Sequence, residues 1–103
     1  MLTLDPYLTD ILLRDLVGHD RRPAAFLVYL WLTAEQQKDA QQRGASVSIS
    51  YQDLAEAIGI SKSSAQSAIA WLLRRKLLTS TKATVTATPE YKVLTPWRRE
   101  NRR

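Results

Sequence analysis

The sequence predicts one mainly helical domain that ends in a small β-hairpin. Four segments before residue 79 combine helix start signals with apolar residues at helical spacing. The stretch from 79 to 95 is rich in β-branched residues and is interrupted by Pro89, which favours two strands joined by a turn. With 103 residues, the chain is long enough for a single modest core and too short for a separate effector-binding domain.

Composition narrows the classes of function. The first 50 residues carry five Lys/Arg and six Asp/Glu, whereas residues 51–103 carry ten and four, so the net charge of +5 is concentrated in the second half. Such asymmetry favours a polyanionic partner, although a basic surface also serves solubility. The chain has no cysteine and one histidine, so we expect no disulfide, no metal and no cofactor. There is no signal-peptide pattern, and the apolar run 24–32 is too short to cross a membrane, so we expect a cytoplasmic protein.

The first helix is predicted over residues 5–17. The Asp5 side chain can accept a hydrogen bond from an amide of the first turn, and Pro6 is tolerated at the first helical position. Gly18 is placed to end this helix. His19 follows in the connection, where a solvated or capping role is more common than a titrating one. The inward face of the helix consists of Leu8, Ile11, Leu12 and Leu16.

The second helix begins at Pro23 and is apolar on nearly every side over residues 24–32. A helix of this kind must be covered on every side, and the first helix is expected to cover one face. A second copy of the protein is a candidate for another face, which would give a homodimer through the N-terminal and second helices. The plainer alternative is that Tyr29 and Trp31 are simply core residues. Gly44 is predicted to end the helix.

Two short helices around a glycine turn follow a short strand. Residues 47–50 alternate like a half-buried strand, and Ser50 is predicted to cap the third helix in a capping-box arrangement with Asp53. Gly59 allows a tight reversal, and Ser61 is expected to cap the fourth helix. The inward residues of the third helix are expected to be Tyr51, Leu54, Ala55 and Ile58.

The C-terminal part is predicted to form a hairpin and a tail. Residues 79–88 are expected to form a strand and a loop, and residues 91–95 form the second strand, which Pro96 stops. Trp97 is expected to pack back on the domain. Residues 98–103 are expected to form a mobile basic tail.

A turn motif with a regular set of apolar positions stands in the second half of the chain. The motif Asp53-Leu-Ala-Glu-Ala-Ile-Gly-Ile-Ser61 is followed by Ala65, Ile69, Leu72 and Leu77-Leu78. In this pattern and in its element order, α-α-β-α-α-β-β, the chain resembles the winged helix-turn-helix domain of bacterial transcription regulators, especially the GntR and MarR types. The resemblance covers about residues 24–97 and implies one domain over 1–97, in which the helix 5–17 is an addition to the winged-helix core. Lys76 stands where the family usually has a helix-ending Gly, so the fourth helix is expected to end differently.

The fourth helix is the candidate DNA-reading element. At about 100° per residue, its predicted inward face contains Ala65, Ile69, Leu72 and Leu73. The opposite face contains Ser63, Ser67, Ala70 and Arg74, with Gln66 and Trp71 on its flanks. Small residues there allow the backbone to approach base edges, and the resemblance makes this the groove-facing set.

The polar residues of this helix are assigned different roles. Gln66 is the candidate for reading a base, since its amide can bond adenine at two atoms. Ser61 and Lys62 at the helix start, and Arg74 near its end, are expected to meet phosphates. Trp71 lies either at the edge of the core or against sugar, phosphate or a partner. Each residue alone is an ordinary surface residue, and the combination favours double-stranded DNA as partner.

The resemblance also implies DNA contacts outside the helix. The hairpin corresponds to the wing, where Lys82 and Lys92 are the cations, so its contacts are expected to be weak and directed to the backbone. The tail either adds salt-dependent phosphate contacts or stays solvated. Its cations are Arg98, Arg99, Arg102 and Arg103.

The sequence leaves several functions open. The leading expectation is a small transcription regulator that binds DNA, and a phage- or plasmid-type replication or partition module fits the same residues. A winged helix that docks proteins without nucleic acid is the second class. An enzyme is not expected, because no nucleophile-base pair, Gly-rich phosphate loop or carboxylate dyad is apparent.

Overall fold

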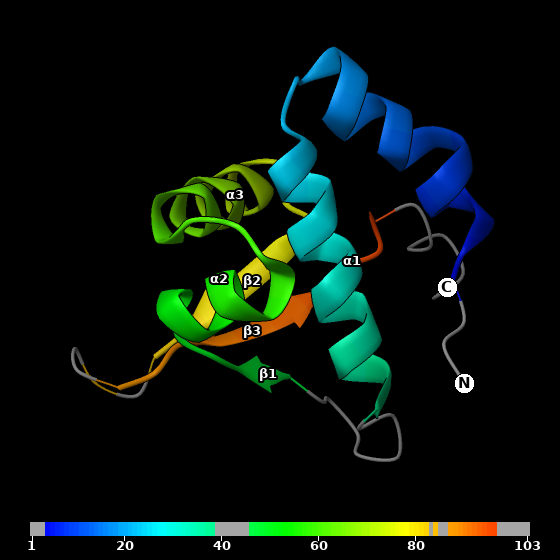
Figure 1. The fold of residues 1–103 in the computed structure, drawn as a ribbon. Coiled ribbons are helices and arrows are strands. Elements are labelled where there is room, and N and C mark those ends of the chain that lie inside the picture. Colours follow the sequence, from blue (N-terminus) through cyan, green and yellow to red (C-terminus); the bar gives the residue numbers. More distant parts are fainter. Residues whose placement is uncertain (1–3, 39–45, 83, 85–86, 97–103) are drawn as a thin grey trace.

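The protein is mainly helical and carries a small three-stranded antiparallel sheet (Figure 1). A computed structural model describes residues 4–38, 46–82, 84 and 87–96. Its first elements are two π-helical stretches, η1 and η2, which together form the N-terminal helix. In chain order the elements are η1 (Leu8–Leu12), η2 (Arg14–His19), α1 (Pro23–Lys38), β1 (Val47–Ser48), α2 (Tyr51–Ile58), α3 (Lys62–Arg74), β2 (Leu78–Thr81) and β3 (Glu90–Val93).

The N-terminal helix begins as predicted but ends later. The amide of Tyr7 donates to the Asp5 carboxylate at 3.0 Å, which confirms the predicted start. Gly18 lies inside η2 and is exposed, so its predicted role as the stop is wrong. The left-handed backbone falls at Arg21 instead, with φ 57°. The helix continues past Gly18 because Asp20, two residues further on, accepts a hydrogen bond from Trp71 of α3.

Helix α1 lies between the N-terminal helix on one side and α2 and α3 on the other (Figure 1). The predicted inward residues of the N-terminal helix are buried at Leu8, Leu12 and Leu16, whereas Ile11 is 38 % exposed. Tyr29 is fully buried and donates its hydroxyl proton to the Leu94 carbonyl at 2.8 Å, which ties α1 to the segment after β3. Trp31 is half-buried and Leu27 is 43 % exposed, so one stripe of this apolar helix faces outward.

The sheet has the strand order β1–β3–β2. The predicted hairpin is confirmed, because β2 and β3 pair antiparallel with Ser80 opposite Tyr91. The predicted short strand also forms, as β1, and pairs with the other edge of β3, where Val47 lies opposite Tyr91. Tyr91 is therefore in the middle of the sheet, and its side chain is buried in the core.

The caps predicted at Ser50, before α2, and at Ser61, before α3, both form, but among the described residues the Asp53 side chain makes no return bond to the Ser50 amide, so the predicted capping box is only half formed. The Ser50 hydroxyl accepts from the amide of Asp53 at 3.1 Å, and the Ser61 hydroxyl accepts from the amide of Ser64 at 3.0 Å. Gly59 takes the left-handed conformation with φ 90°, and its amide donates to the Ala55 carbonyl. In α2, Leu54 and Ala55 are buried as predicted, and the other two predicted inward residues are half-buried.

The end of α3 differs from the expectation. Lys76 adopts the left-handed conformation, φ 61°, which glycine adopts more readily than a residue with a Cβ. The amide of Lys76 donates to the Leu73 carbonyl and that of Leu77 to the Leu72 carbonyl, which is the hydrogen-bond pattern of a Schellman motif. The helix thus ends in the glycine-type manner without a glycine. Leu77 and Leu72 are both buried, so their apolar contact holds Lys76 in a conformation that is unfavourable for a residue with a Cβ.

Some predictions fall outside the described residues. The Gly44 stop, the packing of Trp97 and the tail over 98–103, including Arg98, Arg99, Arg102 and Arg103, are among them. Across the described ranges, no helix is long and apolar enough to cross a membrane. Within the same ranges, His, Asp and Glu nowhere gather in a group of three that would suit a metal ion.

Candidate nucleic-acid interface

Helix α3 presents a continuous polar face to solvent. Its inward side chains Ala65, Ile69 and Leu72 are buried, as predicted, and Ala68 joins them. Leu73, which was predicted to point inward, is 38 % exposed, because at about 100° per residue it lies at the edge of the buried stripe. The residues predicted to face a groove are all exposed: Ser63, Gln66, Ser67, Ala70 and Arg74.

The start of α3 is held by a cluster of serine hydroxyls. The Ser61 hydroxyl lies 3.2 Å from that of Ser63 and 2.9 Å from that of Ser64, in addition to capping the helix. These contacts fix the first turn, from which the exposed Lys62 projects. The first turn of a helix carries amides without a partner inside the helix, so an anion is favoured there.

The start of α3 faces the hairpin across a shallow hollow of about 330 Å³. Lys62 from α3 and Lys82 from the end of β2 both line it, together with Ser50 and Gln52 from the start of α2. Two predicted contact residues that lie 20 positions apart in the sequence are thereby brought to one place. A hollow bordered by two ammonium groups suits an anionic group.

One side of α3 faces the start of α1 across a second hollow, of about 290 Å³. Arg21 and Arg22 border it from the α1 side, and Ser63 and Ser67 from the α3 side. Sequence reasoning did not single out the two arginines. The sequence does show two cations directly before the predicted start of a helix at Pro23. It does not show that this start lies beside α3, which is why the two arginines were not predicted as contact residues.

The C-terminal half of α3 is tied to the end of the N-terminal helix through Asp20. The Asp20 carboxylate accepts from the Trp71 indole N–H at 2.9 Å and also from the Arg75 guanidinium. His19 contacts the other carboxylate oxygen at 3.1 Å. The Trp71 ring in turn lies under two guanidinium groups, with the Cζ of Arg22 at 4.5 Å from the ring centroid and that of Arg74 at 5.7 Å. Trp71, left between core and surface by the sequence, is half-buried and organises the local cations.

Asp20 is the acidic group at the centre of this arrangement, and its side chain is only 6 % exposed. Burial by itself would raise the pKa of the Asp20 carboxyl. The hydrogen bonds from Trp71 and His19 and the positive charge of Arg75 outweigh burial and hold that pKa below its usual value. Asp20 is therefore an anion at neutral pH, and it compensates Arg75 within the protein.

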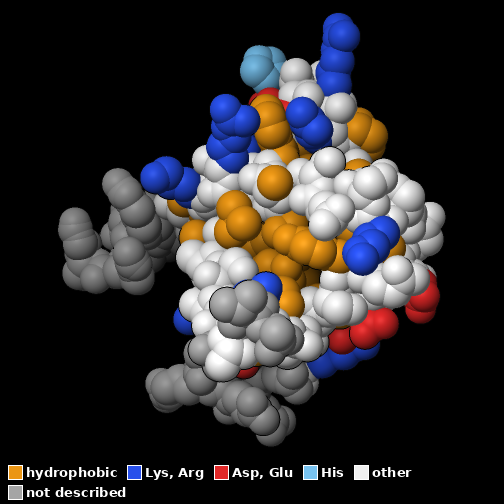
Figure 2. All heavy atoms as spheres, turned by 90° about the vertical axis from the view of Figure 1, so that its left-hand side faces the viewer, with side chains coloured by type: hydrophobic (Ala, Val, Ile, Leu, Met, Phe, Trp, Pro, Cys, Tyr) orange, Lys and Arg blue, Asp and Glu red, His pale blue; other side chains and the backbone are white. Residues whose placement is uncertain are grey.

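Figure 2 shows the face that carries α3 and the hairpin. Lys and Arg side chains are spread over this face around a hydrophobic centre, and most of the acidic side chains in view gather at its lower right edge (Figure 2). The centre of the face is therefore not screened by carboxylates.

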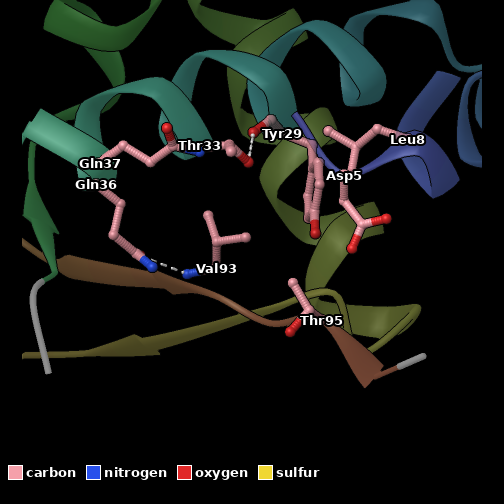
Figure 3. Close-up of a pocket in the computed structure, with 8 residues that line it drawn as sticks. All are labelled: Asp5, Leu8, Tyr29, Thr33, Gln36, Gln37, Val93 and Thr95. Atoms are coloured by element: carbon pink, nitrogen blue, oxygen red, sulfur yellow. Dashed lines mark hydrogen bonds between the residues drawn. The ribbon is translucent and has the colours of Figure 1, made fainter. Parts of the chain in front are cut away.

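A further pocket, of about 230 Å³, lies where the N-terminal helix, α1 and the end of β3 meet (Figure 3). Its polar groups are engaged in holding the fold. The Gln36 side-chain oxygen accepts from the Val93 amide at 2.9 Å, and the Thr33 hydroxyl donates to the Tyr29 carbonyl at 2.8 Å (Figure 3). The bond between Gln36 and Val93 makes the pocket part of the structural joint between α1 and the sheet, whereas the bond between Thr33 and Tyr29 lies within α1.

The predicted contact residues are thus brought together on one side of the molecule. Seven of them lie on or just before α3, and Lys82 joins them across the hairpin-side hollow. Lys92 is exposed on β3, where it pairs with the exposed Thr79 of β2. The tail residues are not described.

Comparison of the chain with protein-family models, with curated proteins and with solved structures finds no match. The function is therefore argued from the residues and their arrangement.

Proposed function

We propose that the protein binds double-stranded DNA as a winged helix-turn-helix domain, with α3 as the helix that enters the major groove. The single observation that supports this most is the exposed polar face of α3, which no carboxylate interrupts and which cation-lined hollows border on both sides. A positively charged surface with a helix as its ridge matches the shape and charge of a DNA groove.

The dimensions of α3 support this proposal. A helix with its side chains is about 10–12 Å in diameter and the major groove is about 12 Å wide, so α3, whose 13 residues span about 18 Å, can lie within the groove. The phosphate backbones that border the groove would then lie near the two hollows. In this arrangement Lys62 and Lys82 contact the phosphate backbone of one DNA strand, and the hairpin acts as the wing.

Direct reading of bases would depend on few side chains. Gln66 is exposed in the middle of the polar face, where its amide can pair with adenine at two atoms. Ser63, Ser67 and Ala70 are small and permit close approach of the backbone. Since so few side chains specify a base, we propose modest intrinsic specificity that increases when two copies bind two half-sites.

A small transcription regulator in the cytoplasm is the role we propose for this DNA binding. A replication or partition module of phage or plasmid type would use the same surface in the same way. We propose no catalysis, cofactor or metal, because the polar groups of α3 suit recognition of phosphates and bases and include no nucleophile activated by a base.

Dimerisation through the N-terminal and second helices is part of the proposal. Leu13 and Val17 of the N-terminal helix are each 38 % exposed, and Leu27 of α1 is 43 % exposed. A second copy would bury these side chains and place two α3 helices on one duplex.

A protein-docking module is the alternative that a specific observation favours. Leu73 adds an exposed apolar side chain at the C-terminal end of α3, next to the polar face. A docking helix would use such a residue as an anchor, whereas a DNA-reading helix has no need of it.

A fluorescence-anisotropy titration distinguishes the two functions. A labelled random-sequence duplex is titrated with the protein at two salt concentrations, with an uncharged polymer as crowding control. We expect micromolar or tighter binding that weakens steeply as salt is raised. The absence of salt-sensitive duplex binding in the micromolar range would exclude the proposed function and leave the docking module.

A further inference from the structure

The corner between the N-terminal helix and α1 packs against α3 and carries two arginines. Arg21 has a left-handed backbone, φ 57°, and Arg22 directly precedes α1. The corner is anchored because Asp20 accepts the Trp71 N–H at 2.9 Å. This anchor places both arginines at the edge of the hollow that Ser63 and Ser67 border from the other side.

The charges of this corner are not neutralised within the described part of the chain. The neighbouring carboxylate, Asp20, is engaged with Arg75, and Arg75 also lies 3.9 Å from Asp15. Neither Arg21 nor Arg22 is paired with a carboxylate among the residues that the structure describes. Both side chains are exposed. Two arginines without a carboxylate partner among the described residues therefore line the hollow.

The Arg22 guanidinium is oriented before any ligand arrives. Its Cζ lies 4.5 Å from the centroid of the Trp71 ring. A guanidinium group over an aromatic ring still has N–H groups to donate, and a pair of them matches two oxygens of a phosphate. Because the side chain is already held, less conformational entropy is lost when a phosphate binds.

We propose that Arg21 and Arg22 bind a backbone phosphate of duplex DNA in the hollow between α1 and α3, with Trp71 as the residue that positions Arg22. This inference rests on the proposed DNA binding and extends it. It assigns the second DNA strand to the α1 side of α3, opposite the strand that contacts Lys62 and Lys82. The serine hydroxyls of Ser63 and Ser67 donate to the same phosphate group or its neighbour.

The first test compares charge removal at the corner with charge removal elsewhere. Arg21→Ala and Arg22→Ala are titrated with duplex over a range of salt, beside Lys38→Ala as a matched control. Lys38 ends α1 and pairs with Glu35 at 2.7 Å, away from the corner. Each arginine variant is expected to lower the slope of log K against log salt by about one, equally on all sequences, with no change for Lys38→Ala.

The second test concerns positioning by Trp71. Arg22→Lys keeps the charge but loses the planar edge, so the salt slope is expected to stay while affinity falls several-fold. Trp71→Phe keeps a ring under Arg22 and removes the N–H that donates to Asp20. When the two variants are compared at the same folded fraction, Trp71→Phe is expected to lose less affinity for the duplex than Arg22→Ala. Thermal unfolding of each variant reports whether it is folded at the assay temperature.

The third test assigns the strand. On a duplex selected from a random library, single phosphates are replaced by uncharged methylphosphonates. On a duplex in which the phosphate contacted by Arg22 is neutral, Arg22→Ala is expected to cause no further loss of affinity. This phosphate is expected to lie on one strand, and the phosphate whose neutralisation removes the effect of Lys62→Ala is expected to lie on the other.

The outcomes separate the two proposals. If the wild-type protein shows no salt-sensitive duplex binding, the proposed function itself fails. If the wild type binds and Lys62→Ala lowers the salt slope while Arg21→Ala and Arg22→Ala leave it unchanged, the DNA-binding function stands and the phosphate site at the corner is wrong. Coupling of Arg22 and Lys62 to the same strand would also overturn the assignment.

Discussion

The indole N–H of Trp71 in α3 donates to the carboxylate of Asp20 at 2.9 Å, across 51 positions of the sequence. This bond joins the end of the N-terminal helix to the helix that carries the candidate interface. It also sets the position of the corner that follows, because Arg22 stacks on the same indole ring. The N-terminal helix is thereby connected to the proposed DNA surface.

Replacing Asp20 by Asn should destabilise the protein by about 1–3 kcal/mol, since the hydrogen bonds from Trp71 and Arg75 lose their ionic acceptor. Urea unfolding at neutral pH measures the loss. Asp10→Asn, on the exposed side of the same helix, is the matched control and should change stability by less than about 0.5 kcal/mol. Equal effects of the two substitutions would contradict the anchoring role.

The stability that Asp20 contributes should depend on pH in the acid range. Its folded pKa is lowered, so the contribution is fully present above the unfolded pKa of an aspartate, about 3.9, and is lost as pH falls through the folded pKa. The difference in unfolding free energy between the wild type and Asp20→Asn should therefore shrink as pH is lowered from about 5 to about 2. A difference that is constant over this range would show that Asp20 is not stabilised as an anion.

Arg74→Ala should weaken duplex binding to a similar extent on all sequences and lower the salt slope by about one. The reason is that Arg74 is exposed near the end of the polar face, where a backbone phosphate is the expected contact. Anisotropy titrations with several unrelated duplexes measure both quantities. A loss confined to one sequence would instead indicate that Arg74 reads a base.

Gln66→Ala should reduce discrimination at one base-pair position by about 1–3 kcal/mol and leave the salt slope unchanged. Binding to a selected duplex and to its single-base variants measures the discrimination. Ser67→Ala, on the next position of the same exposed face, is the control with a smaller expected effect. Unaltered discrimination in Gln66→Ala would remove the base-reading role.

Lys76→Gly should stabilise the protein by up to about 1 kcal/mol, because Lys76 has φ 61° and a glycine adopts this conformation without a Cβ clash. Denaturant unfolding measures the gain. Lys38→Gly, at the last residue of an α-helix, serves as the contrasting variant and is expected to be neutral or destabilising. Destabilisation by both changes would mean that the Lys76 conformation is not strained.

A homodimer should have about twice the mass of the 11.7 kDa chain in light scattering. Leu27→Glu places a charge on the exposed stripe of α1 and should shift the protein toward the monomer without lowering the melting temperature of the monomeric state. A wild type that stays monomeric at high micromolar concentration would exclude the dimer.

Much of the fold was predictable because its signals are local. The caps at Ser50 and Ser61, the turn at Gly59 and the hairpin depend on a few adjacent residues, and all appear in the structure. The buried face of α3 followed from helical periodicity except that Ala68 is buried and Leu73 is exposed, because the buried stripe is centred nearer to Ala68 than was predicted. Gly18 shows the opposite case. Glycine can end a helix, but here the contact between Asp20 and Trp71, which are far apart in the sequence, keeps the chain helical beyond Gly18.

The sequence by itself determined the helices, the turn and the polar residues of α3, because hydrogen bonding and periodicity within a few residues specify them. Only the tertiary structure decided that Arg21 and Arg22 lie beside α3, that Trp71 supports Arg22, and that Lys62 and Lys82 share a hollow. The physical reason is that these groups meet through the packing of α1, α3 and the hairpin. Contacts between distant segments depend on the shape of the whole core, which no local pattern of residues encodes.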